Sequence, residues 1–528
     1  TSFDWTATAS SPNLSGFSDG SGDMIAQTID NSGTTIEFVT YQVTPAANGC
    51  PPGIQMPVVL TVVPRPVITN TTTGFEQCNN TSTSISLESD NPGSTFAWRA
   101  FGTSLNVAGY SNGIGENIIQ SLTNSGYTID TVKYRVAATA NGCPGDSTDL
   151  EVTVFPVADI TFAPNGQAIC SGQTTGLDLQ SQVIGATFTW TATGSDPDVS
   201  GFASGSGSSI QQTLINSGYM LPWVTYQVTP TINGCTGIPD SAVVNVNPLP
   251  VVSLTPCFDT LTTTDAQPIR LQGGIPRGGL FSGPGVDPVT GTFNPGIAGV
   301  GTHQVNYTYI NDYSCSDSSF ASINVYQSIF LNCGDPLTDI RDNQTYPTVD
   351  INGQCWMAAD LNFGNGILSS QMQRDNCVNE KYCYSDNPVN CITYGALYQW
   401  DEVMRYTEDS DVQGMCPPGW HIPSEPEWNT LFSFYISNAY AGDALKSGGS
   451  SGFNTVTSGI RFLNDIWKFP INDTILQSKL YWSSSMHGLQ KAWAHGMNEV
   501  VANTDYTPSV SFYPGMRNNA FAVRCIRD

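Results

Sequence analysis

The sequence has 528 residues, 44 of them acidic and 18 of them Lys or Arg, which gives a net charge of -26. Charged residues make up only 12% of the chain, about half of the usual share, and Ser, Thr, Asn and Gly supply most of its polarity. This composition excludes the basic surface that binds a nucleic-acid backbone and argues against an anionic membrane as a partner. No apolar run approaches the roughly 18 residues of a membrane span, so we expect no membrane insertion.

Fourteen cysteines occur in a chain that has only four His and no C-x-x-C pair. Zinc sites need closer Cys and His spacing, so disulfide bonds are the better interpretation, with buried free thiols as the alternative. Disulfide bonds persist in oxidising surroundings, and we therefore expect the protein to lie outside the cytoplasm.

One sequence skeleton occurs three times in the first half of the chain, with a period of about 92 residues. Each copy begins with an aromatic pair, continues with an NSG turn and a Tyr-x-Val segment, and reaches the Cys of an NGC turn 45 residues after its Trp. The members of the three copies are Phe3, Trp5, Asn31, Tyr41 and Cys50; Phe96, Trp98, Asn124, Tyr134 and Cys143; and Phe188, Trp190, Asn216, Tyr226 and Cys235.

Each copy is predicted to be an antiparallel β-sandwich. Segments such as 39–44 and 58–63 alternate apolar with polar residues, and clusters of Gly, Pro, Asn and Ser separate them. The NGC sequence lies between two such strands, where Asn-Gly supplies the positive φ angles of a tight turn. The Trp of each copy is predicted to lie in the core, with a ligand-binding Trp as the alternative.

The second and third copies have a further cysteine twenty residues before the Trp, which we expect to pair with the NGC cysteine of the same copy. The predicted bonds are Cys78–Cys143 and Cys170–Cys235, each closing a loop of about 65 residues and stabilising by roughly 4 kcal/mol. The first copy has only four residues before its Trp, so Cys50 has no such partner. We therefore expect the natural chain to extend upstream.

A fourth module with a different pattern is predicted from about Ser253 to Gln327. It contains GGIPRGGLFSGPGV, then GTFNP, then a strand at 303–310 that ends near Cys315, and we expect Cys257 to pair with Cys315. The predicted domains are four tandem β-sandwiches and a fifth domain of another class, with the boundaries 1–66, 67–158, 159–251, 252–327 and 328–528.

The composition changes after about residue 327, where seven of the eleven Trp and seven of the fourteen Cys are found. Helical spacing of apolar residues first occurs in the segment 394–406. The apolar residues of this segment are Leu397, Tyr398, Val403 and Met404.

A capping box at Ser424 and Glu427, with a proline in the first turn, predicts a second helix. Strands are predicted at 479–483 and 520–526, so the fifth domain is of the α+β class. The residues that the second helix is expected to bury are Trp428, Leu431, Phe432 and Tyr435.

These motifs resemble known families. The repeated F-x-W, NSG and Y-x-V…NGC elements of residues 1–251 resemble the PKD-like and Ig-like repeats of very long surface proteins in Bacteroidota, and GGxPxGGxFSGPGV looks like a second Ig-like type. From about Cys333 to Asp528, the segments GQCWMAADLNFG, EKYCY, TYGALYQWDEVMRY, CPPGWHIPSEPEWNTL, YWSSS and FAVRCIRD are similar to the Fibrobacter succinogenes major paralogous domain. That family is similar to the C-type lectin-like fold, and the resemblance implies secretion and a surface role.

The resemblance leaves the disulfide bonds of the fifth domain partly open. We expect Cys383 and Cys391 to close a local loop, and Cys416 and Cys525 to join the helical region to the last strand. The remaining cysteines, whose pairing the sequence leaves open, are Cys333, Cys355 and Cys377.

The sequence contains no pattern that indicates catalysis. Neither GxSxG string, at 16–20 or 448–452, follows a buried strand and opens a helix as a nucleophile elbow does. His421, next to the capping box, is predicted to be a structural hydrogen bonder, and none of the four His has metal-binding spacing. We therefore predict that the protein is not an enzyme and requires no cofactor. The other three His are His303, His487 and His495.

Binding is expected in loops of the fifth domain, where the regions 464–473 and 493–505 combine aromatic, amide and carboxylate groups. Trp467 is predicted to stack on a sugar ring or an apolar partner. Oxygen donors would ligate Ca²⁺, although the EPN, QPD and WND calcium signatures of sugar-binding C-type lectins are absent from the sequence. The alternative is that Trp493 is core and the acidic residues are solvated. The candidate calcium ligands are Asp465, Glu499, Asn503 and Asp505, and the ligand-binding set adds Trp467, Trp493 and Asn498.

Five Asp-Ser or Asp-Thr sequences resemble the O-glycosylation acceptor that Bacteroidota use on exported proteins. The candidate modified residues are Thr131, Ser147, Ser241, Thr260 and Thr474.

The function predicted from these features is that of a long secreted adhesin or filament on the cell surface of a Gram-negative bacterium. Rigid repeats would form a stalk, and the fifth domain would be a lectin-like tip that binds a glycan or a protein. The alternative is a structural fibre or gliding-motility component, in which this domain is a cap or an assembly contact. Other partners would then be fibre subunits or the secretion and anchoring machinery, with type IX secretion as the expected route.

Overall fold

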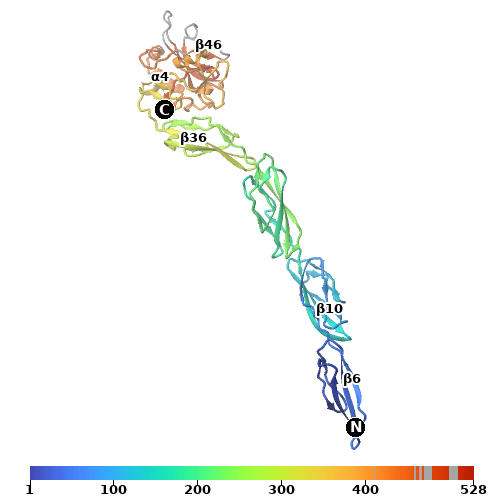
Figure 1. Ribbon diagram of the computed structural model, residues 1–528. Helices are drawn as coiled ribbons and strands as arrows, with labels where there is room; N and C mark the ends of the chain where they lie inside the picture. The colour runs from blue at the N-terminus through green and yellow to red at the C-terminus, as the bar shows by residue number, and fades with distance from the viewer. Residues whose placement is uncertain (411, 457–458, 463–465, 469–477, 499–508) are drawn as a thin grey trace. The chain divides into compact units, whose positions relative to one another are not determined.

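The computed structural model describes the whole chain except residues 411, 457–458, 463–465, 469–477 and 499–508. The described chain forms two compact units, Thr1–Pro248 and Leu249–Asp528, and it contains the predicted tandem β-sandwiches (Figure 1). None of the described helices is long and apolar enough to cross a membrane.

The first unit contains three repeats of one strand plan. The strands of the first repeat are β1 (Ser2–Ala9), β2 (Leu14–Ser15), β3 (Gly20–Ser21), β4 (Asp30–Asn31), β5 (Glu37–Ala46) and β6 (Met56–Val62). Those of the second repeat are β7 (Gly74–Cys78), β8 (Thr81–Ser82), β9 (Ile85–Ser86), β10 (Thr95–Gly102), β11 (Val107–Ala108), β12 (Gly113–Ile114), β13 (Asn117–Ile118), β14 (Ser121–Asn124), β15 (Asp130–Ala140) and β16 (Cys143–Phe155). Those of the third repeat are β17 (Thr161–Ala163), β18 (Gln167–Cys170), β19 (Leu177–Gln180), β20 (Thr187–Gly194), β21 (Val199–Ser200), β22 (Gly205–Ser206), β23 (Ser209–Ile210), β24 (Ile215–Asn216), β25 (Trp223–Ile232), β26 (Cys235–Thr236) and β27 (Asp240–Asn247).

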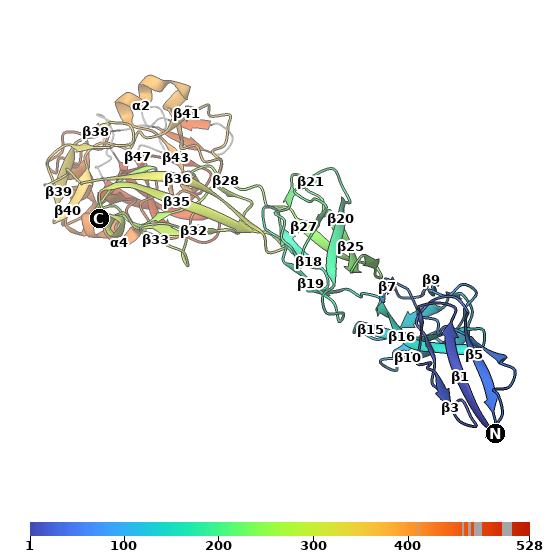
Figure 2. The same ribbon diagram turned by 60° about the horizontal axis from the view of Figure 1, so that its bottom comes forward.

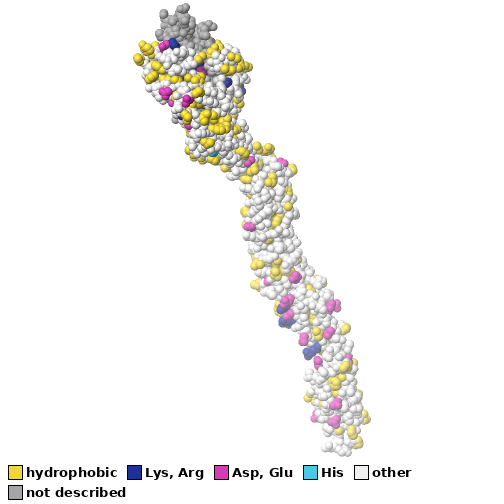
Figure 3. All heavy atoms as spheres, turned by 60° about the vertical axis from the view of Figure 1, so that its left-hand side comes forward, with side chains coloured by type: hydrophobic (Ala, Val, Ile, Leu, Met, Phe, Trp, Pro, Cys, Tyr) yellow, Lys and Arg dark blue, Asp and Glu magenta, His cyan; other side chains and the backbone are white. Residues whose placement is uncertain are grey.

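The main sheet of each repeat has the same order. It runs β3-β1-β5-β6 in the first repeat, β12-β10-β15-β16-β7 in the second and β22-β20-β25-β27-β18 in the third. Inward-facing residues of these strands are apolar and outward-facing residues are mostly Ser, Thr and small polar residues, as the alternation predicts. Accordingly, most of the face of this unit that Figure 3 shows belongs to neither the hydrophobic nor the charged class.

Three side chains of the shared skeleton make equivalent hydrogen bonds in every repeat. The buried Trp donates its indole N–H to a backbone carbonyl at 3.2–3.3 Å, and the Tyr hydroxyl donates to a Gln Oε1 at 2.7–2.9 Å. The buried Asn of the NSG turn donates Nδ2 to two carbonyls at 2.8–3.0 Å, one of them in the last strand of the repeat. The predicted core position of the Trp is thereby confirmed, and the NSG Asn ties a turn to the sheet.

The NGC sequences form the predicted tight turns. Asn141 and Gly142 have φ angles of 48° and 82°, and Asn233 and Gly234 have 45° and 80°. In the first repeat Gly49 alone of this pair has a positive φ, at 79°.

The predicted disulfide bonds within the repeats are wrong. Cys78 is bonded to Cys235, with a Cα–Cα distance of 5.3 Å, so the bond joins the second repeat to the third. Cys143 is a free thiol, as is Cys50. Cys170 is disulfide-bonded, but not to its predicted partner Cys235.

Strand pairing explains why the bond crosses between repeats. The strand β7 pairs in parallel with β16, which places Cys78 opposite Phe155. Cys143 is the first residue of the 13-residue strand β16 and Phe155 is its last, so the two lie roughly 40 Å apart. The early cysteine therefore lies at the end of its sandwich from which the chain enters the next repeat, where Cys235 meets it.

The second unit begins with a smaller sandwich. Its main sheet has the order β29-β36-β35-β32, and the long strands β35 and β36 run side by side in Figure 2. Its elements are β28 (Ser253–Leu254), β29 (Leu261–Thr263), β30 (Ile269–Arg270), β31 (Gly274–Ile275), β32 (Leu280–Ser282), β33 (Val286–Asp287), β34 (Thr292–Phe293), α1 (Pro295–Ala298), β35 (Gly301–Ile310) and β36 (Ser316–Tyr326).

The rest of this unit, here called the C-terminal domain, mixes short helices with small sheets. Its helices are η1 (Tyr384–Asp386), α2 (Pro388–Tyr394), α3 (Trp400–Val403), α4 (Glu425–Ser433) and α5 (Asn438–Leu445). Its strands are β37 (Leu337–Thr338), β38 (Thr345–Tyr346), β39 (Thr348–Ile351), β40 (Gln354–Met357), β41 (Asn365–Ile367), β42 (Glu380–Tyr382), β43 (Tyr398–Gln399), β44 (Trp420–His421), β45 (Ile460–Phe462), β46 (Ile466–Lys468), β47 (Ser478–Met486), β48 (Lys491–Asn498), β49 (Ser509–Met516), β50 (Ala520–Phe521) and β51 (Ile526–Arg527).

One of the two predicted helices is present. The helix α4 follows Ser424, whose backbone N–H donates to the Glu427 carboxylate at 2.7 Å, and it buries Trp428, Leu431 and Phe432. Tyr435 lies beyond its end and is half-buried. The predicted strand at 479–483 lies within β47, whereas 520–526 is divided between β50 and β51.

The helix predicted at 394–406 is wrong. Only the last residue of α2 and the four residues of α3 are helical there, and Tyr398 belongs to the strand β43, where it pairs with Phe521. Leu397 exchanges backbone hydrogen bonds with Tyr382 at 2.9 and 3.0 Å. These residues are buried because strands lie on both sides of them, so their apolar spacing does not mark one face of a helix.

The C-terminal domain contains the two disulfide bonds expected for it, Cys383–Cys391 and Cys416–Cys525. A third bond, Cys333–Cys355, lies next to the start of β40. The fourth overturns the predicted bond Cys257–Cys315. Cys257 pairs with Cys377 because its loop packs on the C-terminal domain, and Cys315 is disulfide-bonded elsewhere.

Candidate functional site

The predicted ligand site lies mostly outside the described residues. This applies to Asp465, Glu499, Asn503 and Asp505, and to the glycosylation candidate Thr474. Trp467 belongs to β46 and Asn498 ends β48, but their side chains are not among those described. Trp493 is half-buried on β48 and its ring centroid lies 4.3 Å from that of His487. The proposed ligand and calcium set therefore stays a prediction, and no group of three or more His, Cys, Asp or Glu within the described ranges is arranged to hold a metal ion.

The four described glycosylation candidates differ in accessibility. Ser147 on β16 of the second repeat and Ser241 on β27 of the third repeat are exposed. Thr131 and Thr260 are half-buried, and Thr260 follows an aspartate that is itself buried in an ion network. Ser147 and Ser241 are therefore the better acceptors on accessibility alone.

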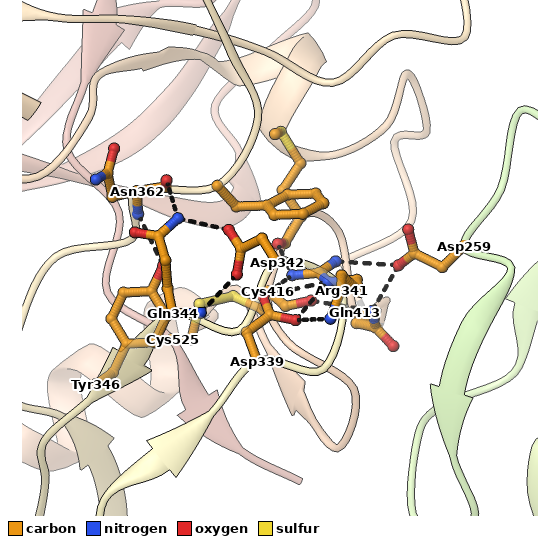
Figure 4. A network of polar contacts seen from close by, with 12 residues as sticks. Asp259, Asp339, Arg341, Asp342, Gln344, Tyr346, Asn362, Gln413, Cys416 and Cys525 are labelled. Atoms are coloured by element: carbon orange, nitrogen blue, oxygen red, sulfur yellow. Dashed lines mark hydrogen bonds and ion pairs between the residues drawn. A yellow bond between two sulfur atoms is a disulfide. The ribbon is translucent and has the colours of Figure 1, made fainter. Parts of the chain in front are cut away.

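The most elaborate described cluster lies where the fourth sandwich meets the C-terminal domain. Asp259, just before β29, accepts from Arg405 at 2.6 Å, from Arg341 at 3.0 Å and from the amide of Gln413 at 3.2 Å. Figure 4 shows Arg341 lying between Asp259 on one side and Asp339 on the other, and the Arg341–Asp339 contact is 2.7 Å. We call these five residues the junction network.

The junction network is a buried set of charges that satisfy one another. Burial alone would raise the pKa of Asp259, but the charges of Arg405 and Arg341 lower it below its usual value. The Arg341 guanidinium also lies 3.9 Å from the ring centroid of Phe363 and donates to the Met415 carbonyl at 2.9 Å. Together with the Cys257–Cys377 bond, the junction network fixes the C-terminal domain on the fourth sandwich.

A cavity of about 340 Å³ opens beside the junction network. Both the sandwich and the C-terminal domain line it, with apolar side chains among charged ones. Its volume suits a small ligand rather than a polysaccharide chain. The lining residues that carry this character are Phe258, Asp259, Ile269, Arg270, Arg405 and Val412.

A smaller hollow of about 60 Å³ is lined by both cysteines of the Cys257–Cys377 bond. Glu402 of α3 lines it, and burial raises the pKa of this carboxyl to about 7. The carboxylate accepts from the Glu380 N–H at 2.7 Å and from the Tyr406 hydroxyl at 2.8 Å. These two hydrogen bonds fix the orientation of the Glu402 carboxylate, which therefore has a structural role.

A second ion cluster lies inside the C-terminal domain itself. Asp360 contacts Arg524 at 2.7 Å, Tyr481 at 3.1 Å and the ammonium of Lys479, and all these charged side chains are almost inaccessible. Arg524 also donates to the carbonyls of Met357 at 3.1 Å and Asn454 at 3.0 Å. The segments GQCWMAADLNFG and FAVRCIRD supply Asp360 and Arg524, so these two segments meet in one buried ion cluster.

His421 is confirmed as a structural hydrogen bonder. Its Nδ1 lies 2.6 Å from Asp528 and its Nε2 lies 2.9 Å from Glu427 of the capping box. Burial alone would lower the pKa of His421, but these hydrogen bonds and carboxylate charges raise it to about 9. The imidazolium therefore links the start of α4 to the last residue of the sequence.

Sequence reasoning missed the junction network and the cavity. Asp259 and Arg405 are 146 positions apart, and nothing in the sequence around either residue indicates that they meet. No signal in the sequence indicated this contact, because Cys257 was expected to pair with Cys315 and not with a cysteine of the C-terminal domain.

The fold defines the class of this protein: a modular protein of tandem β-sandwiches, stabilised by disulfide bonds of the kind that form outside the cytoplasm. Family models then identify the modules. A PKD-like domain matches residues 1–66, 76–158 and 167–250, and the Fibrobacter succinogenes major domain matches residues 349–527. The chain therefore carries three PKD-like domains and a C-terminal Fibrobacter succinogenes major domain.

A search of curated proteins finds no match to the sequence. Among solved structures, Drosophila N-cadherin EC1-4 aligns at 11% identity over 61% of this chain and 92% of its own, with a TM-score of 0.16. Human mucin-like protocadherin EC1-2 aligns at 12% identity over 35% and 98%, with a TM-score of 0.21. The Dpr2 Ig1-Ig2 structure, in complex with DIP-Theta Ig1-Ig3, aligns at 11% identity over 50% and 100%, with a TM-score of 0.23.

Proposed function

We propose that this chain is part of a secreted cell-surface adhesin. Its disulfide-linked sandwiches form a stalk that resists extension, and its C-terminal domain binds a glycan or a protein on another surface. The resemblance of its repeats to Bacteroidota surface proteins supports a Gram-negative cell surface and type IX secretion as its setting. The protein acts by binding and not by catalysis.

The observation that carries the proposal is the bond between Cys78 and Cys235. A pulling force that enters at Cys78 passes through the disulfide to Cys235 and bypasses the chain that leads from Cys78 into the third repeat. The sequence separation is 157 residues, which covers most of two repeats. A disulfide bond between repeats is useful to a protein that carries force along its length. The same bond has no evident use in a binding protein that diffuses freely.

Single-molecule pulling on the ends of residues 1–528 tests the stalk. Reduction should add at least about 500 Å to the fully extended length, because each residue freed from the disulfide loop adds roughly 3.3–3.6 Å. Cys50 and Cys143 are replaced by Ser in every sample so that free thiols cannot exchange with the bonds. Equal extended lengths before and after reduction would contradict the proposal.

A glycan array and a panel of host and bacterial surface proteins, probed with the whole chain, test the binding domain. We expect saturable binding that Trp467→Ala or Trp493→Ala weakens at least tenfold, with Trp223→Ala in the third repeat as the matched control. Trp223 is exposed and lies outside the C-terminal domain, so its loss should leave binding unchanged.

A structural fibre is the second candidate function. Absence of binding to every glycan and protein surface, together with retained resistance to extension, would favour it. The observation in its support is again the Cys78–Cys235 bond, which a fibre that carries force would use whether or not its C-terminal domain binds a ligand.

A further inference from the structure

The first repeat exposes a sheet face that the other two repeats bury. Val58 and Leu60, on β6, have 52% and 46% of their surface exposed. The equivalent residues, 92 positions later in each repeat, are Leu150 and Val152, and then Ala242 and Val244, all with 0–1% exposed. The same strand thus carries core residues in two repeats and surface residues in one.

The residues that cover this face elsewhere come from the start of each repeat. In the second repeat they are Ile68, Ile85 and Leu87, together with half-buried Phe75 of β7. In the third repeat the corresponding group precedes its Trp in the same way. Its members are Ile160, Ile169, Leu177 and Leu179.

The edge of β6 is open as well. The equivalent strands β16 and β27 each pair in parallel with an early strand, β7 or β18, through residues 151–155 and 244–247. No described strand pairs with the outer edge of β6. An apolar edge strand with free N–H and C=O groups is a template for strand addition.

A free thiol marks the same junction. Cys143 is equivalent to Cys235, which holds the early cysteine of the preceding repeat. Gly145 packs on the Pro66 carbonyl as Gly237 packs on the Ala158 carbonyl, so the two junctions are built alike. An early cysteine added beside β6 would lie opposite Val63, in the place that Cys78 has opposite Phe155.

We propose that this face binds a strand segment of the same pattern as residues 67–90, supplied by the same polypeptide N-terminal to Thr1. Its strand pairs in parallel with residues 59–63, its apolar side chains cover Val58 and Leu60, and its cysteine forms a disulfide bond with Cys143. A second copy of the chain is not the source, because its own residues 67–90 already cover the sheet of its second repeat. The first and second repeats are thereby bonded through the same connectivity as the second and third, from the early cysteine of one repeat to the NGC cysteine of the next.

A synthetic peptide of residues 67–90 tests the proposal on the whole chain. In a glutathione redox buffer, its cysteine should cross-link to Cys143 at least tenfold more than to Cys50, as mapped by mass spectrometry. Amide hydrogen exchange of residues 59–63 should slow at least tenfold in the complex. A peptide with Phe75→Asp and Ile85→Asp is the control, and it should do neither.

Two neighbouring substitutions distinguish the proposed face from the other side of β6. Leu60→Asp should abolish peptide binding, whereas Val59→Asp, on the opposite face, should leave it unchanged; circular dichroism checks that both variants are folded. Equal cross-linking to both thiols, no cross-linking, or equal loss in both variants would overturn the proposal. Dimerisation of the chain through β6 without peptide would overturn it in favour of a second copy.

Discussion

The PKD-like repeats and the C-terminal domain bury polar groups in different ways. In the repeats, the described buried polar groups are neutral: Asn side chains, Thr and Tyr hydroxyls and the Trp indole. Their described ion pairs, such as Arg135–Asp149, lie on the surface. The C-terminal domain instead buries full charges around Asp360 and, at its junction with the fourth sandwich, around Asp259.

This difference predicts different sensitivities. The repeats should respond to close packing and respond little to loss of a charge, because surface ion pairs contribute at most about 1 kcal/mol. The C-terminal domain should lose much of its free energy of unfolding when one member of a charge cluster is removed, because the remaining charges are then buried without a partner. Repeats of the first kind should tolerate changes of pH and salt that the C-terminal domain would not.

Asp360→Asn should have the largest effect. It leaves Lys479 and Arg524 without their carboxylate and should lower the free energy of unfolding of the C-terminal domain by about 3–5 kcal/mol. Calorimetry of the whole chain should show one transition moving while those of the repeats stay in place. Asp312→Asn, at an exposed aspartate of the same unit, is the control. Loss of stability in the repeats as well would break the comparison.

Gly113→Ala should have the next largest effect, within the second repeat. A Cβ at this position would lie 2.4 Å from the Trp98 ring, so either the indole or the strand must move. We expect the unfolding free energy of this repeat to fall by about 1–3 kcal/mol, measured by chemical denaturation. Gly74→Ala is the control because a Cβ there meets open space. Equal effects of the two substitutions would contradict the packing argument.

His421 gives the C-terminal domain a pH dependence that the repeats should lack. Its pKa is raised to about 9 from the usual 6.5, so the protonated ring stabilises the fold fully below pH 6.5. This contribution is lost as the pH rises through 9. His421→Gln should lower the unfolding free energy by about 1.5 kcal/mol at pH 6 and by much less at pH 10. An imidazole titration by NMR with a midpoint near 6.5 would contradict the assigned contacts.

Tyr134→Phe should have the smallest effect, about 1 kcal/mol. It removes the hydrogen bond to Gln120, but that Gln Oε1 still accepts from the Ser111 N–H at 3.0 Å. Tyr226→Phe should cost the same in the third repeat, measured by the same denaturation assay. A loss of several kcal/mol in only one repeat would mean that the shared skeleton is not energetically equivalent.

The sandwiches, their core Trp residues and the NGC turns could be predicted because strand alternation and turn chemistry are local signals. The cysteine pairing could not, because periodic spacing is equally compatible with bonds within a repeat and between repeats. The parallel strand β7 decides between them, and its place in the sheet is a long-range property.

In the C-terminal domain, the capping box predicted α4 because Ser424 and Glu427 are three residues apart. The apolar spacing near Leu397 led to the wrong prediction of a helix. The segment is buried because strands pack on both sides of it, and not because it presents one apolar helix face. Asp360 and Lys479 are 119 positions apart, so only the fold brings this charge cluster together. The candidate ligand residues rest on composition and resemblance, and they remain predictions.

The central claim is that disulfide bonds run from one repeat to the next. Proteolysis of the unreduced chain, with its free thiols blocked beforehand, followed by mass spectrometry of the cross-linked peptides, tests it most directly. The account predicts a peptide pair that contains Cys78 and Cys235 and an alkylated Cys143. A pair that contains Cys78 and Cys143, or Cys170 and Cys235, would contradict it.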